Sequence, residues 1–254
     1  MGSLKARLQA GQVQRGLWLG LGCPASTEIA STAGFDWCLI DGEHGPYDIS
    51  AIAAQARVLG PEACVRIPQA ETWMIKQVLD LGLHTVVVPM VDTAEQAHEM
   101  ACAMRYPSKA FPNGTRGIGA SLVRASGYNH DKDYMMQAND RVCLMVQAES
   151  VTALENLDAI CAVNGVDGVF IGPADLAASM GYLHDLDAPE VQAAIDDALR
   201  RIVASGKIAG ALSFDADRAA HYVDLGARMV AVASDIALLS TALRDCAKRF
   251  TPEP

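Results

Sequence analysis

Short apolar runs alternate with longer amphipathic stretches along the 254-residue chain, and this alternation restricts the fold more than any other feature. The runs have the length and β-branched content of buried strands, and the stretches have the apolar spacing of helices. The predicted strands are Gly16–Leu21, Trp37–Ile40, Cys64–Ile67, Thr85–Met90, Val142–Gln147, Gly168–Ile171, Ile208–Leu212 and Met229–Ala233. The predicted helices are Thr27–Ala33, Ile49–Leu59, Thr72–Leu81, Ala94–Arg105, Val151–Ala162, Pro189–Ala204, Ala216–Leu225 and Ile236–Arg249. Eight strand–helix repeats predict an α/β chain folded as a closed (β/α)8 TIM barrel.

An open, doubly wound sheet is the alternative for alternating strands and helices. It usually needs fewer units and a Gly-rich first turn, and the first turn here, Leu19–Pro24, lacks the G-x-G-x-x-G spacing. No linker or change of composition divides the chain, so we expect a single domain over residues 1–254, with its core at about 16–250. Tyr106–Asn139 is the one long connection, and Asp131–Ala138 is its expected helix.

The bulk composition excludes some classes of protein. A formal net charge of −10 and a pI near 5.0 disfavour a nucleic-acid partner, since such proteins normally present a basic face. No apolar run approaches the ~18 residues of a membrane span, so we expect no membrane partner. Seven scattered cysteines without a C-x-x-C pair are typical of a reducing compartment. With no signal-peptide pattern at Met1–Ala10, these features predict a cytoplasmic protein.

Two carboxylates follow neighbouring predicted strands. Glu149 comes after Val142–Gln147, and Asp175 comes 26 positions later, after the turn Gly172–Pro173 that ends Gly168–Ile171. Because parallel strands of a barrel end at one mouth, we expect both side chains there. Paired carboxylate oxygens favour a hard divalent cation, although Glu149 also suits an exposed position at a helix start.

Other polar residues fall at the same predicted mouth. Asp41 and His44 follow the second strand, and Arg66 lies in the otherwise apolar third strand. A buried Arg66 requires an anionic partner, which is either a structural carboxylate or a substrate. His44 has acidic neighbours and is a candidate base. Asp41 also fits a turn or cap, and so does Asp235 after the eighth strand.

These motifs resemble the HpcH/HpaI aldolase family over about Gly16–Phe250. The resemblance rests on separate stretches in the same order, which are Ile40-Asp41-Gly42-Glu43-His44, Val65-Arg66-Ile67-Pro68, Val88-Pro89-Met90-Val91 and Val146-Gln147-Ala148-Glu149, together with the Gly172–Asp175 stretch. Within this family, the chain resembles the class II pyruvate aldolases, which act on 4-hydroxy-2-oxo acids. The resemblance implies reversible aldol cleavage to pyruvate or hydroxypyruvate and an aldehyde.

The resemblance also implies roles by position. Glu149 and Asp175 would bind the metal, most readily Mg²⁺ or Mn²⁺, with Co²⁺ or Zn²⁺ as alternatives. Arg66 would lie beside the pyruvate oxygen, and His44 would be the catalytic histidine, with Asp41 as its acidic neighbour and Asp80 orienting it. The remaining substrate contacts would come from Gln147, Gly172, Pro173, Ala174 and Leu212, with backbone N–H groups at Gly172 and Ala174 because Pro173 has none.

The resemblance further implies a homo-oligomer, a hexamer built as a trimer of dimers that exchange their last helix, Ile236–Arg249. The chain departs from the family pattern in two places. Ser108-Lys109-Ala110 belong to an apparent insertion of four residues before Phe111–Gly117, and Ala174 stands where some relatives have Ser. Both departures are expected to affect which aldehyde is accepted.

Two rival functions are compatible with such a barrel. A CoA-ester lyase of the citrate or malyl lyase type would need a basic groove, which this acidic chain does not offer. A non-catalytic metal- or oxo-acid-binding barrel would not need a base such as His44. No lysine lies at a predicted strand end, which favours a metal-dependent aldolase over one that forms an imine.

Overall fold

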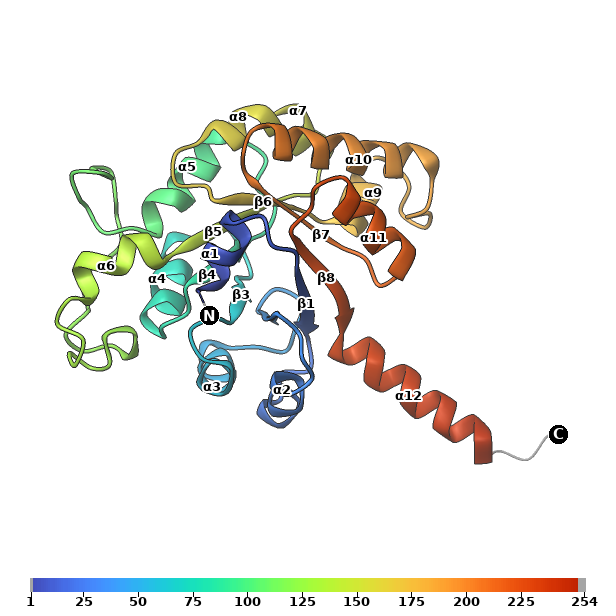
Figure 1. Ribbon diagram of the computed structural model, residues 1–254, viewed down its shortest axis with the longest axis horizontal. Coiled ribbons are helices and arrows are strands. Elements are labelled where there is room, and N and C mark those ends of the chain that lie inside the picture. Colours follow the sequence, from blue (N-terminus) through green and yellow to red (C-terminus); the bar gives the residue numbers. More distant parts are fainter. Residues whose placement is uncertain (1, 251–254) are drawn as a thin grey trace.

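The structure is a computed structural model that describes residues 2–250, and its centre is a closed barrel of eight parallel strands (Figure 1). The strands are β1 Gln14–Leu19, β2 Trp37–Asp41, β3 Cys64–Arg66, β4 Thr85–Val88, β5 Cys143–Ala148, β6 Gly168–Ile171, β7 Ile208–Leu212 and β8 Met229–Ser234. Each strand pairs with the next along the chain, and β8 pairs with β1 to close the barrel. The predicted (β/α)8 fold is confirmed.

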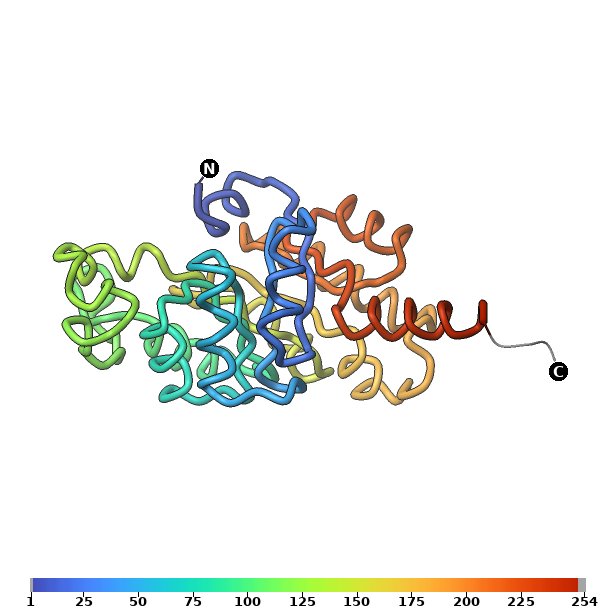
Figure 2. The backbone as a smooth tube through the Cα atoms, turned by 90° about the horizontal axis from the view of Figure 1, so that it is seen from below, coloured from blue at the N-terminus to red at the C-terminus, as the bar shows by residue number. Residues whose placement is uncertain are grey.

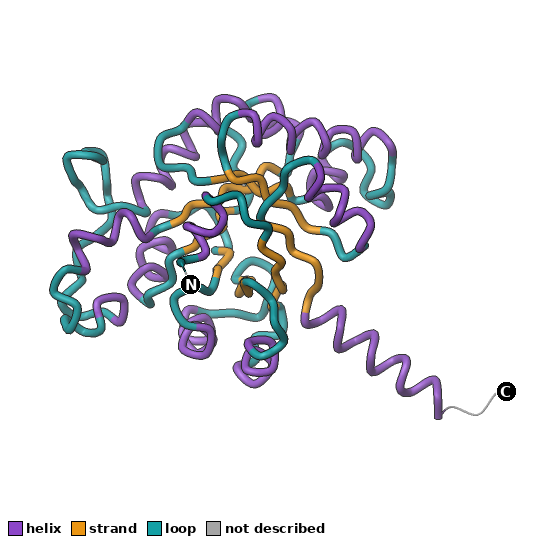
Figure 3. The backbone as a smooth tube through the Cα atoms, in the orientation of Figure 1, coloured by secondary structure: helices purple, strands orange, loops and turns teal. Residues whose placement is uncertain are grey.

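Helices surround the strands in the order expected for this fold (Figure 3). They are α1 Leu4–Gln9, α2 Pro24–Ser31, α3 Ile49–Leu59, α4 Thr72–Asp80, α5 Ala94–Ala103, α6 Tyr134–Arg141, α7 Val151–Glu155, α8 Leu157–Ala162, α9 Pro173–Ser179, α10 Pro189–Ala204, α11 Ala216–Asp224 and α12 Asp235–Phe250. The predicted helix Val151–Ala162 is two helices, because the chain leaves the helix at Asn156. The short helices α1 and α9 were not predicted.

The barrel interior is filled by large side chains from alternate strand positions. Trp18, Leu39, Met145 and Phe170 belong to this inner core, and Leu4 and Leu8 of α1 join it. Helix α1 lies by the amino ends of the strands (Figure 2), so it closes the end of the barrel opposite the mouth. A second and larger core lies between strands and helices and contains Leu19, Ile40, Ile75, Leu144 and Leu199 among others.

The long connection between α5 and β5 carries a 3₁₀ turn at Arg124–Ser126 and helix α6. Its anchor is Arg116, a buried cation that pairs with Asp80 of α4 at 3.1 Å. The guanidinium also stacks on Tyr106 and Tyr134, at 4.5 and 5.7 Å from the ring centroids. The predicted helix Asp131–Ala138 is present as α6, shifted by about one turn.

Helix α12 does not fold back on the barrel and projects away from it (Figures 1 and 2). Asp235 at its first position is buried, whereas Ile236, Leu239, Leu243 and Phe250 are exposed. Among residues 2–250, no helix is long and apolar enough to cross a bilayer. Five of the seven cysteines are buried, namely Cys38, Cys64, Cys102, Cys143 and Cys161.

Candidate active site

Arg66, the last residue of β3, lies at the mouth of the barrel and is only 6% exposed. Its Nε and Nη2 donate to the two carboxylate oxygens of Asp41, each at 2.8 Å, and the guanidinium lies 4.9 Å from the Trp18 ring centroid. Trp18 in turn donates its Nε1–H to Asp41 at 3.0 Å. Burial pushes the pKa of Asp41 upward, but the hydrogen bonds and charge of Arg66 outweigh it and hold that pKa below its usual value. The structure thus pairs Arg66 with a carboxylate from β2.

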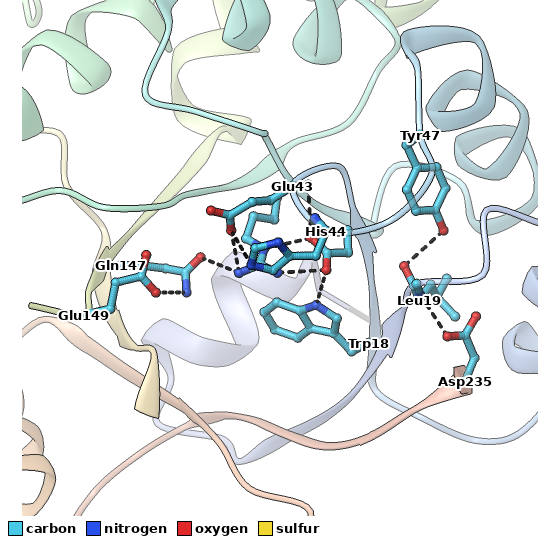
Figure 4. Close-up of polar contacts among 11 residues, drawn as sticks. Trp18, Leu19, Glu43, His44, Tyr47, Gln147, Glu149 and Asp235 are labelled. Atoms are coloured by element: carbon cyan, nitrogen blue, oxygen red, sulfur yellow. Dashed lines mark hydrogen bonds and ion pairs between the residues drawn. The ribbon is translucent and has the colours of Figure 1, made fainter. Parts of the chain in front are cut away.

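Two further side chains of the β2–α3 loop approach Arg66. Glu43 Oε2 lies 2.7 Å from Arg66 Nη1, and the Nε2 of His44 lies 3.9 Å from the same oxygen. Figure 4 shows Glu43 and His44 side by side near Trp18, facing Gln147 and Glu149. Burial raises the pKa of Glu43, although the charges of Arg66 and His44 oppose the shift. The His44 side chain is 68% exposed, so its imidazole faces open space at the mouth.

Glu149 follows β5 and is 2% exposed, with no ion pair to any residue in the described range 2–250. Its Oε1 accepts the Met90 N–H at 2.8 Å, and its Oε2 accepts Gln147 Nε2 at 2.9 Å. Met90 holds its N–H there from a left-handed backbone, with φ of 52°, which is rare outside glycine. Burial raises the pKa of Glu149 to about 7, and the nearby Asp175 and Glu43 carboxylates add to the shift.

The turn after β6 brings Asp175 toward Glu149. Gly172 precedes α9, Pro173 opens it, and Asp175 lies in its first turn. A Cβ atom on Gly172 would lie 2.1 Å from Glu149 Oε2, so only glycine lets the turn pass this closely. The backbone of the predicted oxo-acid loop is therefore packed directly against the predicted metal ligand.

These groups line one pocket of about 320 Å³ at the mouth. It brings together most of the predicted site residues, which are His44, Arg66, Gln147, Glu149, Gly172, Pro173, Ala174, Asp175 and Leu212. Asp41 lies behind Arg66 and holds it. Larger cavities of about 530 and 410 Å³ occur elsewhere, one between the amino ends of the strands and α1 and one beside α11. Neither contains the carboxylate pair.

Two of the acidic residues considered in the sequence, Asp80 and Asp235, lie away from the pocket. Asp80 is the last residue of α4, which runs antiparallel to the strands, so it lies toward the other end of the barrel, paired with Arg116. Within one chain it does not contact His44, and its orienting role stays a prediction. Asp235 accepts backbone N–H groups from Gly20, Leu21 and Ile236, so it ties the end of β1 to the start of α12.

Several residues of the site were not predicted from the sequence. Trp18, Phe170 and Leu186 supply apolar walls of the pocket, and Glu43 contacts both Arg66 and His44. Trp18 and Phe170 carried a usable signal, because both are aromatic and each stands one position before the last residue of its strand. Leu186 lies in the loop between α9 and α10, where no pattern of the sequence indicates its direction.

The donor set fits a divalent cation bound only partly by protein. Within residues 2–250, no three or more His, Cys, Asp or Glu side chains converge as a complete cage. A buried carboxylate without a cationic partner, next to a second carboxylate, nevertheless leaves negative charge uncompensated. Mg²⁺ is commonly bound by one or two carboxylates plus water and substrate oxygens. Glu149 and Asp175 match that pattern.

An arginine, a histidine and paired carboxylates at the carboxyl ends of the strands define a (β/α)8 barrel of the enzyme type. The sequence profile of the HpcH/HpaI aldolase/citrate lyase family matches residues 14–242, so the chain belongs to this family. The family comprises carbon–carbon lyases, and dependence on a divalent metal is general among its aldolases. The predicted family and class of enzyme are confirmed.

Individual relatives cover nearly the whole chain. A hydroxypyruvate/pyruvate aldolase of Agrobacterium fabrum is 51% identical over 98% of this chain and 95% of its own. A 2-keto-3-deoxy-L-rhamnonate aldolase of Escherichia coli is 49% identical over 94% of this chain and 89% of its own. The crystal structure of an HpcH/HpaI aldolase/citrate lyase family protein from Burkholderia cenocepacia superposes with a TM-score of 0.92 at 35% identity, covering 97% of this chain and 98% of that one.

Proposed function

We propose that this chain is a class II aldolase that reversibly cleaves 4-hydroxy-2-oxo acids into an aldehyde and pyruvate or hydroxypyruvate. The observation that carries the proposal is the pocket itself, where Arg66 and His44 face the carboxylates of Glu149 and Asp175, and neither carboxylate forms an ion pair with a residue in the range 2–250. A binding protein would not need both a charge-stabilising arginine and an exposed imidazole. The relatives named as aldolases support the same reaction class.

Glu149 and Asp175 would hold the metal, Mg²⁺ or Mn²⁺ by preference, since both cations favour carboxylate oxygens. When bound, the cation supplies Lewis-acid polarisation of the 2-oxo group and offsets the charge of the two carboxylates. The chain's own residues prepare this place. Met90 N–H and Gln147 Nε2 fix both oxygens of Glu149, and Gly172 leaves room for them.

Arg66 stabilises the negative charge that develops on the 2-oxo oxygen. Cleavage of the C3–C4 bond sends its electron pair toward that oxygen, and a preorganised cation lowers the barrier most where charge accumulates. Asp41 takes the Nε and Nη2 side of the guanidinium, which leaves Nη1 directed at Gln147 and Glu43. Nη1 is therefore the donor for the oxo acid.

His44 is the base in this proposal. Cleavage begins when the proton of the 4-hydroxyl leaves, and an exposed imidazole at the mouth can accept it directly or through water. The apolar side of the pocket, formed by Trp18, Phe170, Leu186 and Leu212, receives the aldehyde portion. The N–H groups of Gly172 and Ala174 are the proposed donors to the carboxylate of the oxo acid.

The active form is proposed to be a homo-oligomer, a hexamer of three dimers that exchange α12. The support is the exposed apolar face of α12, because the helix projects away from the barrel after Ile236, which itself lies beside Gly20. A helix with such a face is stable in water only when another surface covers it.

A pyruvate-release assay tests the proposed function. The protein is stripped with EDTA and then assayed with Mg²⁺ or Mn²⁺ on a panel of 4-hydroxy-2-oxo acids, with pyruvate and hydroxypyruvate compared as donors in the reverse direction. We expect metal-dependent release from at least one substrate. Full activity of the stripped protein would overturn the metal requirement, and no cleavage of any member would overturn the aldolase assignment.

A further inference from the structure

Glu43 is a charged side chain at the mouth that the proposed mechanism leaves without a task. A single oxygen of it faces both cationic groups of the site, at 2.7 Å from Arg66 Nη1 and 3.9 Å from His44 Nε2. That oxygen is buried, and it forms no hydrogen bond of normal geometry to any residue in the described range. A buried carboxylate oxygen without an aligned donor is costly, so its position calls for an explanation.

Support of Arg66 alone does not explain Glu43. Asp41 already binds two guanidinium nitrogens in the bidentate arrangement that holds arginine most firmly, and Trp18 stacks on it. Glu43 Oε2 instead lies 2.7 Å from Nη1, the guanidinium nitrogen that makes no hydrogen bond to Asp41 and that the proposed function assigns to the oxo acid. In the free enzyme it therefore competes with the substrate for that donor.

His44 has the opposite need. Its ring is largely exposed, and Glu43 is the only residue among 2–250 whose side chain forms an ion pair with it. Once His44 has accepted a proton it carries a positive charge that a nearby carboxylate stabilises. At 3.9 Å the carboxylate is too far for a hydrogen bond, and a change of the Glu43 rotamer would close the gap.

Resting on the proposed function, we propose that Glu43 is a positioning residue that transfers Oε2 from Arg66 to His44 when a 2-oxo acid takes Arg66 Nη1. The handover links the two halves of the site, because the histidine gains a hydrogen bond to this carboxylate only while substrate holds the arginine. The handover requires an anionic 2-oxo acid, because only a substrate with an oxygen that binds Arg66 Nη1 displaces the Glu43 carboxylate. Burial, which raises the pKa of Glu43, adds to the strain of the free state.

The proposal makes an unusual kinetic prediction for Glu43→Gln, which keeps the size of the side chain and removes its charge. The donor substrate no longer displaces a carboxylate, so KM for the 2-oxo acid should fall by about fivefold, the scale of one partly exposed ion pair. The histidine loses its counter-charge, so kcat for aldol cleavage should fall by about tenfold. A lower KM is expected when Glu43 no longer competes with the substrate for Arg66, and a lower kcat is expected when His44 loses its carboxylate partner. General damage to the site would instead raise KM.

Oxaloacetate separates the two effects. Its loss of CO₂ forms the same pyruvate enolate with no hydroxyl to deprotonate, so it needs Arg66 and not the base. We expect Glu43→Gln to retain at least the wild-type kcat for this decarboxylation. A parallel fall of cleavage and decarboxylation would overturn the handover, since Glu43 would then act on Arg66 alone.

Binding provides a test without turnover. Isothermal titration of the metal-loaded protein with pyruvate should give about fivefold tighter binding to Glu43→Gln than to wild type. Glu95→Gln, an equal change of charge at the exposed start of α5, should bind like wild type. Equal affinities for all three proteins would overturn this inference alone. If the protein binds pyruvate but cleaves no 4-hydroxy-2-oxo acid, the proposed function alone is overturned. If neither wild type nor Glu43→Gln binds pyruvate, both the proposed function and this inference are overturned.

Discussion

Arg66 donates two hydrogen bonds of 2.8 Å to the two oxygens of Asp41, which comes from the neighbouring strand β2. The two residues are register partners in the barrel, so the pairing of β2 with β3 places them opposite each other. A cation in an apolar strand is costly unless it is paired. Asp41 removes that cost and fixes the guanidinium with Nη1 toward the pocket.

Removal of Arg66 should therefore reduce turnover strongly. Arg66→Ala is expected to lower kcat for pyruvate release by about 10²–10³-fold, by analogy with the loss of an oxyanion-stabilising donor. Because this change leaves the buried Asp41 without a cationic partner, the thermal midpoint must be measured alongside.

Arg66→Lys is the matched variant for that experiment. It keeps a positive charge near Asp41 but loses the planar fork, so it should fold more stably than Arg66→Ala while remaining slow. Near wild-type pyruvate release by either variant contradicts the assigned role of Arg66.

Gly172→Ala should weaken metal binding. The added methyl group would lie 2.1 Å from Glu149 Oε2, so the carboxylate or the turn must move. We expect the affinity for Mn²⁺, measured by calorimetry, to fall by about 10-fold or more, the scale of a disturbed ligand environment. Ala174 lies in the same turn and is exposed, so the Ala174→Ser protein should bind Mn²⁺ like wild type. Unchanged affinity in Gly172→Ala would argue against Glu149 as a ligand.

His84 makes stability depend on pH at a place remote from the pocket. Burial, aided by the charges of Arg141 and Arg116, lowers its pKa from 6.5 to about 4 in the folded chain. The unfolded chain therefore takes up the proton first as pH falls, so folding stability is lost between about pH 6.5 and pH 4. The loss is at most about 3 kcal/mol.

His84→Gln should remove this part of the pH dependence. The free energy of unfolding is measured in urea at pH 7 and at pH 4.5 for both proteins. Its decrease from pH 7 to pH 4.5 should be smaller for the variant than for wild type. Carboxylates add their own acid sensitivity, so the informative quantity is the difference between the two proteins. Equal losses on acidification would show that His84 is not held neutral by the fold.

The sequence was sufficient for the barrel, because strand and helix periodicities are local properties and eight repeats leave few closed topologies. It was also sufficient for the residues at the strand ends, such as Arg66 and Glu149. It could not provide the φ of Met90 or the contact of Gly172 with Glu149, since both depend on how separate strands approach each other. The position of Asp80 could not be predicted either, because its spacing from Arg66 does not show that α4 carries it to the other end of the barrel.

Helix α12 leads to the last prediction. Ile236, Leu239, Leu243 and Phe250 recur at the spacing of one helix face and are all exposed. If a second copy of the chain covers this face, Leu239→Asp with Leu243→Asp should dissociate the oligomer, because the charges would be buried in an apolar contact. Size-exclusion chromatography with light scattering should then report a smaller species. Thr241→Asp, which adds one negative charge on the opposite side of α12, should stay assembled. A wild-type protein that is monomeric throughout would contradict the proposed exchange of α12 between subunits.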